Sequence, residues 1–116
     1  MQPLIDPNHL ALYVGDDLGL RNEILAIFED QLEYWLERLD PAMEDKDWHL
    51  ASHTLKGASC GVGAWEIGKL SEKSESLVGD IENKSGQRKE MVITLHGLIH
   101  SVLKEISVMC DEQAVA

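Results

Sequence analysis

The sequence lacks several features that define common protein classes. Its only cysteines, Cys60 and Cys110, do not have the spacing of metal ligands, so we expect reduced thiols. The 10 Lys and Arg are outnumbered by 21 Asp and Glu, and the formal charge of −11 opposes binding to nucleic acids and anionic membranes, which are bound through cationic side chains. No apolar run approaches the roughly 20 residues that span a bilayer, and the first residues do not resemble a signal peptide. We therefore expect a cytoplasmic protein.

Helix breakers and strand patterns are also scarce. Gly and Pro are rare inside the long periodic segments, and alternating β-branched residues are nearly absent, which indicates an all-α fold. The 116 residues suit a single domain over 1–116, and an apolar content of 44% is enough for one core. We expect the tail, residues 111–116, to fray.

The first two helices have clear boundary signals. Pro7 suits the first position of a short helix with Asp6 as its N-cap, and Gly15 stops it. Asp16 or Asp17 then caps a long second helix. Its expected apolar stripe, broken only by a glutamine, consists of Ile24, Ile27, Phe28, Gln31, Leu32, Trp35, Leu36 and Leu39.

Three further segments complete the helical pattern. Pro41 either ends the second helix or begins a short turn over 42–45. Asp47 can cap a third helix over 48–60, and Gly61 or Gly63 can supply the left-handed residue after it. We expect a fourth helix over 64–82, a turn over 83–86 and a fifth helix over 87–110. The buried stripe of the fourth is weakened by two serines and comprises Ala64, Ile67, Leu70, Ser71, Ser74, Leu77, Val78 and Ile81.

The connections between these long amphipathic helices are short, which favours antiparallel neighbours. We therefore predict that the second to fifth helices form an antiparallel up-down-up-down four-helix bundle. The short first helix would cover one end as a cap.

His53 is the central candidate for chemistry. Each helical residue turns by about 100°, so the apolar residues of the third helix cluster opposite His53 and leave its ring in solvent. These residues are Ala51, Leu55, Ala58 and Val62. A neutral imidazole is a competent nucleophile near neutral pH, and its attack on an acyl phosphate would give a phosphoramidate labile enough to pass the phosphoryl group on.

Three residues can serve such a histidine. Lys56, one turn on, supplies a positive charge, although an exposed lysine is usually only solvated. Gly57 lowers helix stability by about 1 kcal/mol relative to alanine, and its missing side chain leaves room for a partner beside the ring. Glu75 lies at the boundary of the fourth helix's stripe and can accept a hydrogen bond from the ring, or it is one more solvated glutamate.

Histidine pairs also permit a metal site. His49 and His53, and likewise His96 and His100, have the i,i+4 spacing that can chelate a divalent ion. Neither pair has a glutamate directly after its first histidine, and neither has an obvious third ligand from cysteine. We therefore expect no metal site.

The run HTLKGASCGVGA over 53–64 resembles the signature of histidine-containing phosphotransfer (HPt) domains, roughly H-x-L-K-G-[SA]-[SA]-x-x-x-G-[AL]. Residues 47–75 resemble the core of that family. The resemblance implies that His53 is phosphorylated on its outward nitrogen, that Lys56 helps to hold the phosphoryl group, that Gly57 clears room for the partner, and that Glu75 bonds the ring. Ser74 and Ser71 depart from the pattern, because many members have Leu at the first position and Cys or Ala at the second.

The resemblance also implies the partners. Receiver domains, which carry a phospho-accepting aspartate and Mg²⁺, dock on the face around the histidine, built from the first three helices. The expected contacts are Leu10, Ala11 and Val14 on the first helix and His49 on the third. The metal belongs to the partner, so we expect this chain to need no cofactor and to have no ATP site of its own.

Together these features predict a monomeric phosphorelay intermediate in two-component signalling, which accepts a phosphoryl group from a receiver or hybrid kinase and donates it to another receiver. It would mediate transfer without being a kinase. The alternative is a non-catalytic helical adaptor that regulates a kinase or response regulator, although an adaptor does not need the nucleophile at His53.

Overall fold

The described part of this computed structural model covers residues 2–115, with side chains described through residue 111. It contains α1 (Pro7–Val14), α2 (Leu18–Arg38), α3 (Asp45–Val62), α4 (Trp65–Glu75) and α5 (Lys84–Val115). No strand occurs among these residues, which confirms the all-α prediction.

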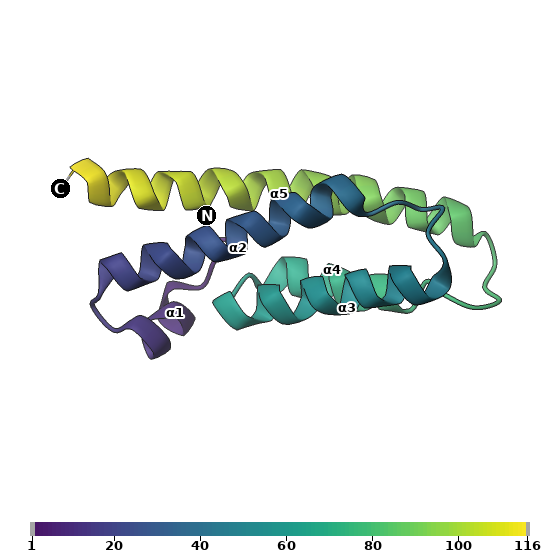
Figure 1. Cartoon of the computed structure of the whole chain (residues 1–116), viewed down its shortest axis with the longest axis horizontal. Helices are drawn as coiled ribbons and strands as arrows, with labels where there is room; N and C mark the ends of the chain where they lie inside the picture. Colours follow the sequence, from purple (N-terminus) through teal and green to yellow (C-terminus); the bar gives the residue numbers. More distant parts are fainter. Residues whose placement is uncertain (1, 116) are drawn as a thin grey trace.

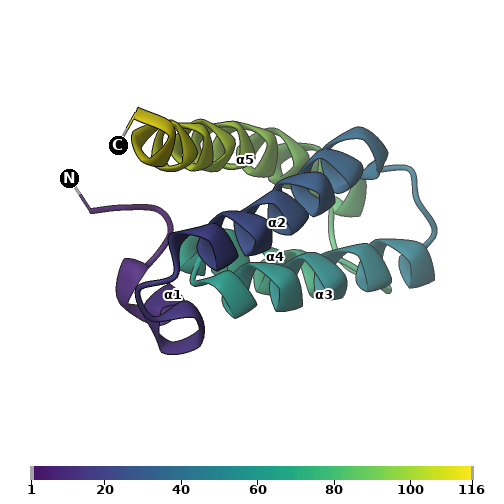
Figure 2. The ribbon, with the colours of Figure 1, turned by 60° about the vertical axis from the view of Figure 1, so that its left-hand side comes forward.

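The four longer helices pack around a shared core (Figure 1). Helix α2 packs against α3 and α5, and α4 also packs against α3 and α5, while α1 packs against α2. Along the colour gradient of Figure 1, α2 runs from left to right, α3 returns, α4 runs to the right again and α5 returns to the left. Figure 2 shows α1 beside the end of α3 and the start of α4, at one end of the molecule.

One core is built from apolar side chains of every helix. The largest fully buried residues are Trp48, Phe28, Ile5, Leu10, Leu25, Leu32, Leu55, Ile67, Leu95, Ile99, Ile106 and Val102. The stripe predicted on α2 was partly wrong. Ile27 is 62% exposed and Gln31 is exposed, whereas Leu25, left out of the stripe, is completely buried. The buried face of α2 follows the spacing of Leu25, Phe28 and Leu32, with Leu39 just beyond the helix.

The predicted boundaries of α1 are confirmed. The Asp6 carboxylate caps it by accepting from the backbone N–H groups of Asn8 and His9, and Gly15 ends it with a φ of 54°. Asp17 caps α2 by accepting from the N–H of Leu20. Helix α2 ends at Arg38, before Pro41, which settles the boundary that the sequence left open.

Two boundaries of α3 and α4 differ from the sequence prediction. Helix α3 begins at Asp45 rather than Trp48, so Asp47 lies inside its first turn and is not the cap. The left-handed residue directly after α3 is Gly63, with a φ of 83°, one of the two glycines predicted there. Helix α4 ends at Glu75 rather than near residue 82, and Gly79 with a φ of 78° follows in an irregular segment.

The irregular segment still serves the core. Leu77 is buried, and Val78 and Ile81 pack against the core from outside any helix. Asn83, with a φ of 50°, precedes α5, which begins at Lys84, three residues earlier than predicted. The backbone of α5 is helical through Val115, although fraying was predicted from residue 111, and Ala116 lies outside the described residues.

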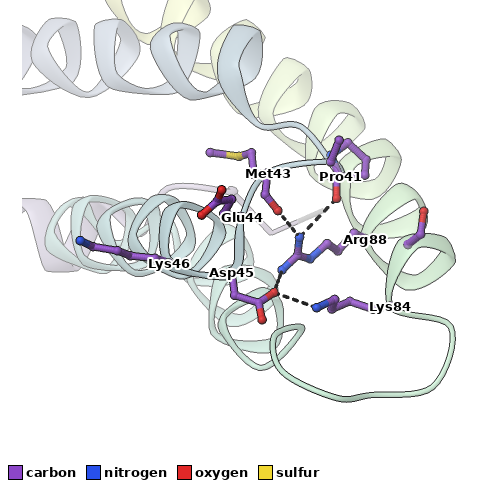
Figure 3. A pocket seen from close by; sticks show the side chains of 9 residues that line it. Pro41, Met43, Glu44, Asp45, Lys46, Lys84 and Arg88 are labelled. Atoms are coloured by element: carbon purple, nitrogen blue, oxygen red, sulfur yellow. Dashed lines mark hydrogen bonds and ion pairs between the residues drawn. The ribbon is translucent and has the colours of Figure 1, made fainter.

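Arg88 joins the segments at the far end of the molecule (Figure 3). Its side chain is 2% exposed, and its guanidinium lies 4.7 Å from the centre of the Trp48 ring. The guanidinium donates to three backbone carbonyls and one carboxylate: Leu77 O at 2.8 Å, Met43 O at 2.7 Å, Pro41 O at 3.3 Å and Asp45 Oδ1 at 2.7 Å. A buried guanidinium needs such partners, and they fix the two connecting segments against α5.

Helix α5 is long and apolar enough to cross a membrane by length and composition alone, with a mean hydropathy of 1.3 over its most apolar window in Lys84–Asp111. The core helix of a soluble protein passes the same test. Four of its residues, Leu95, Ile99, Val102 and Ile106, are each 1% exposed in the shared core. These residues hold one face of α5 in the shared core, and a single helix of this kind does not indicate a membrane protein.

The Asp45 carboxylate predicts how stability responds to acid. A hydrogen bond from Lys84 lowers the pKa of Asp45 below its ordinary value of 3.8, and the Gly79 N–H and the charges of Lys84 and Arg88 act in the same direction. A carboxyl group whose pKa is lower in the folded than in the unfolded state stabilises the fold at pH values above its unfolded pKa. This stabilisation is lost as the pH falls through the folded pKa. We expect Asp45→Asn to be less stable at neutral pH and to lose less stability below about pH 4.

Urea unfolding followed by circular dichroism between about pH 2 and pH 7 measures both effects. Asp47→Asn, a change at an exposed residue of the same first turn, is the control and should follow the wild type. Identical pH profiles for Asp45→Asn and wild type would contradict the assignment.

Candidate functional site

His53 lies on the solvent side of α3. Its side chain is 65% exposed, whereas Ala51, Leu55 and Val62, on the opposite side of the helix, are 2%, 1% and 8% exposed. The helical period therefore turns the ring outward while its neighbours hold the helix in the core. No side chain of the described residues encloses this imidazole.

Glu75, the last residue of α4, contacts the inner edge of this ring. His53 Nδ1 lies 3.1 Å from Glu75 Oε1, and the glutamate side chain is only 17% exposed. A carboxylate can only accept, so the hydrogen bond places the proton of the neutral ring on Nδ1. The lone pair is then on Nε2, at the opposite edge of the ring.

Lys56 lies between two carboxylates beside the histidine. Its Nζ is 3.9 Å from Glu72 Oε1 and 4.0 Å from Glu75 Oε1, and its side chain is 35% exposed. Such long, partly exposed ion pairs contribute little to stability. The ammonium is therefore held near the ring while remaining free to turn toward an incoming anion.

Gly57 leaves open space next to His53 on the helix surface. A Cβ added at this exposed glycine would meet no atom within 4 Å. Packing inside the chain therefore does not require a glycine here, although glycine lowers helix stability by about 1 kcal/mol relative to alanine. The gap remains available to another molecule.

His49 lies one turn before His53 and forms part of the same surface. The two rings are nearly parallel, with centroids 6.2 Å apart and planes at 12°. His49 Nδ1 lies 3.4 Å from the backbone oxygen of Glu75, so both histidines face the end of α4. Within residues 2–111, the side chains of His, Cys, Asp and Glu form no group of three that could hold a metal ion.

The residues proposed on α1 are arranged differently from the sequence prediction. Leu10 is 2% exposed and Val14 is 8% exposed, so neither side chain is available to a partner, and only Ala11 is exposed. The i,i+4 pair of Leu10 and Val14 is the buried face of this two-turn helix. Its large exposed apolar residues are Leu12 and Tyr13, which the sequence analysis did not single out.

Helix α1 is fixed to the turn between α3 and α4. The Asp6 N–H donates to Gly63 O at 3.0 Å, and Trp65 Nε1 donates to Asp6 Oδ2 at 3.1 Å. The Trp65 hydrogen bond, together with the backbone N–H groups of His9 and Asn8, lowers the pKa of Asp6. These bonds hold α1 at the end of α3 that follows His53.

The sequence analysis also missed a polar contact directly behind the site. Ser52 Oγ and Ser74 Oγ lie 2.6 Å apart, with the two residues 1% and 0% exposed. The only sequence signal was the presence of serines on otherwise apolar stripes. Their pairing depends on how the two helices meet, which one helical wheel does not show.

These residues can present one solvated nitrogen nucleophile, with a positive charge nearby and a gap beside it. Such a site is the kind expected of a helical domain that presents a histidine to another protein. A family model described as the Hpt domain matches residues 23–107, most of the chain, and the chain therefore belongs to the Hpt domain family. This confirms the resemblance seen in the sequence.

The matched region includes His53, Lys56, Gly57 and Glu75 but not α1. Neither the curated proteins nor the solved structures that were searched contain a match. Membership of the family places the chain in histidine phosphotransfer of two-component signalling, where Hpt domains interact with receiver domains and kinases.

Proposed function

We propose that this chain is a phosphorelay intermediate that accepts a phosphoryl group on His53 from a receiver aspartate and passes it to another receiver. The main support is the setting of the His53 ring, whose Nδ1 is bonded to Glu75 while its side chain is 65% exposed. We further propose that it acts as a cytoplasmic monomer. Its scaffold would be an antiparallel up-down-up-down bundle of α2 to α5, with α1 as the cap.

The chemistry follows from the ring's tautomer. The Nε2 lone pair attacks phosphorus, an N–P bond forms, and the P–O bond to the aspartate breaks, so that the aspartate leaves as a carboxylate. The phosphorylated ring keeps its Nδ1 proton and becomes positively charged, and Glu75 stabilises this charge. Reversal by a second receiver aspartate returns the neutral ring. No cofactor is needed on this chain, and Mg²⁺ is expected on the receiver.

Transfer of the phosphoryl group to His53 is the first prediction. A purified phosphorylated receiver mixed with this protein should transfer radiolabel to it, and the product should be labile in acid and stable in base. His53→Gln should abolish transfer, because the amide has no nucleophilic ring nitrogen. His100→Gln, a change at an exposed histidine on α5, is the control and should accept label normally.

Labelling of His53→Gln would place the nucleophile elsewhere. Binding of a receiver without any transfer would favour the adaptor function instead.

Lys56 is expected to accelerate transfer without supporting the fold. Its ammonium can compensate the charge on the phosphoryl oxygens as they pass to Nε2. Lys56→Ala should slow transfer roughly tenfold, which corresponds to about 1.4 kcal/mol of activation free energy. Lys69→Ala, which removes an exposed lysine of α4, should leave the rate unchanged. Rapid-quench kinetics gives the rates, and equal rates for both variants would remove Lys56 from the site.

Gly57 is expected to matter for docking alone. Gly57→Glu should fill the gap beside the ring and add a negative charge, and so weaken receiver binding at least about tenfold, or 1.4 kcal/mol. Circular dichroism should remain helical, because a Cβ at this position meets no atom of the described chain within 4 Å and the residue is exposed. Gly97→Glu is the matched control, since Gly97 is also an exposed glycine with open space around it on α5. Calorimetric titration with a receiver measures both, and equal affinities would contradict the docking role.

A further inference from the structure

The end of α4 is fixed to α3 by several hydrogen bonds. Behind the surface pair of His53 and the partly buried Glu75 lies the buried pair of Ser52 and Ser74, whose hydroxyl oxygens are 2.6 Å apart. Trp48 Nε1 also donates to the Ser74 carbonyl at 2.7 Å. Helix α4 stops at Glu75, immediately after these contacts.

The serine pair and the His53–Glu75 pair belong to the same alignment of α4 along α3, one residue apart on each helix. Ser52 precedes His53, Ser74 precedes Glu75, and the partners are 22 residues apart in both pairs. One residue along a helix turns the side chain by about 100°, so each helix moves from the core to the surface in a single step. Whatever fixes the serine pair therefore also fixes where the carboxylate meets the ring.

The buried serine pair is better suited than the His53–Glu75 pair to set the register of α4 along α3. Water can replace the Glu75 hydrogen bond at a ring whose side chain is 65% exposed, and partly exposed ion pairs of this kind are weak. The two serines are 1% and 0% exposed, so a displacement of α4 that separates their hydroxyls breaks this hydrogen bond where water does not replace it, which is unfavourable.

We propose that Ser52 and Ser74 are positioning residues for His53. Their buried hydrogen bond holds α4 in the register that brings Glu75 Oε1 to His53 Nδ1, and so keeps the ring in the tautomer with Nε2 free. The effect on phosphotransfer rests on the proposed function, whereas the effect on the tautomer does not.

The chain provides internal controls. Ser59 on α3 and Ser71 on α4 are also completely buried, and neither hydroxyl has a hydrogen-bond partner among the described residues. Ser71→Ala therefore removes a buried hydroxyl from the same helix without breaking a contact to α3. Any general effect of changing a buried serine should appear in this variant as well.

The experiment compares Ser74→Ala, the double variant Ser52→Ala with Ser74→Ala, and Ser71→Ala. Nitrogen-15 NMR of the labelled imidazole reads the His53 tautomer directly. We expect the Nδ1–H form in the wild type and in Ser71→Ala, and a clear increase of the Nε2–H form in the other two. The double variant leaves no hydroxyl unpaired, so it should fold with little loss of stability even where Ser74→Ala does not.

Transfer kinetics supplies the second measurement. The double variant should lower kcat for transfer from a phosphorylated receiver roughly threefold to tenfold with little change in KM, because fewer rings present a free Nε2. A wild-type tautomer in the double variant would overturn the proposal, as would an equal shift in Ser71→Ala. If the tautomer shifts but the wild type accepts no phosphoryl group, the positioning role stands and the proposed function fails. If the wild type accepts a phosphoryl group but the tautomer does not shift in the double variant, the proposed function stands and the positioning role fails.

Discussion

The close contact between α3 and α4 is the constraint on which the site depends. Gly68 marks how near the two helices come, because a Cβ at this position would lie 2.6 Å from Cys60 Sγ. A short separation lets side chains as small as serine meet between the helices, and the buried Trp48 indole reaches the carbonyl of Ser74. The ring of His53 comes from one of these helices and its carboxylate partner from the other, so their hydrogen bond exists only in this packing.

The far end of the molecule supports the same contact. The Arg88 guanidinium covers the Trp48 ring. It donates hydrogen bonds to the Asp45 carboxylate at the start of α3 and to the Leu77 carbonyl in the segment that follows α4. Asp45 also accepts from the Gly79 N–H in the segment that follows α4. A displacement of α4 along α3 would thus disturb a buried charge as well as the buried hydroxyls, and both are unfavourable.

Local periodicity explains which parts of this structure were predictable. The outward ring of His53 follows from apolar residues within one helix, and the caps of α1 and α2 follow from Asp6 and Asp17 beside their own N–H groups. The early end of α4 was not predictable in this way, because Leu77 and Ile81 continue its apolar spacing while packing on the core from an irregular segment. The start of α3 at Asp45 was not predictable either, because the hydrogen-bond donors of its carboxylate lie more than 30 residues away in the sequence. Leu10 and Val14 belong to a helix that is too short for its sequence to show which face is buried.

The acidic surroundings of His53 bear on how a phosphoryl group would behave there. The sequence carries a formal charge of −11, and the ammonium of Lys56 is already placed between Glu72 and Glu75. In the proposed function, a phosphoryl group on Nε2 would compete with these two carboxylates for one cation, and their negative charges would oppose its own. A site that stored phosphate would surround it with donors. In the proposed function, one lysine shared with two glutamates would compensate this charge only in part, which suits a histidine that receives a group in order to give it away.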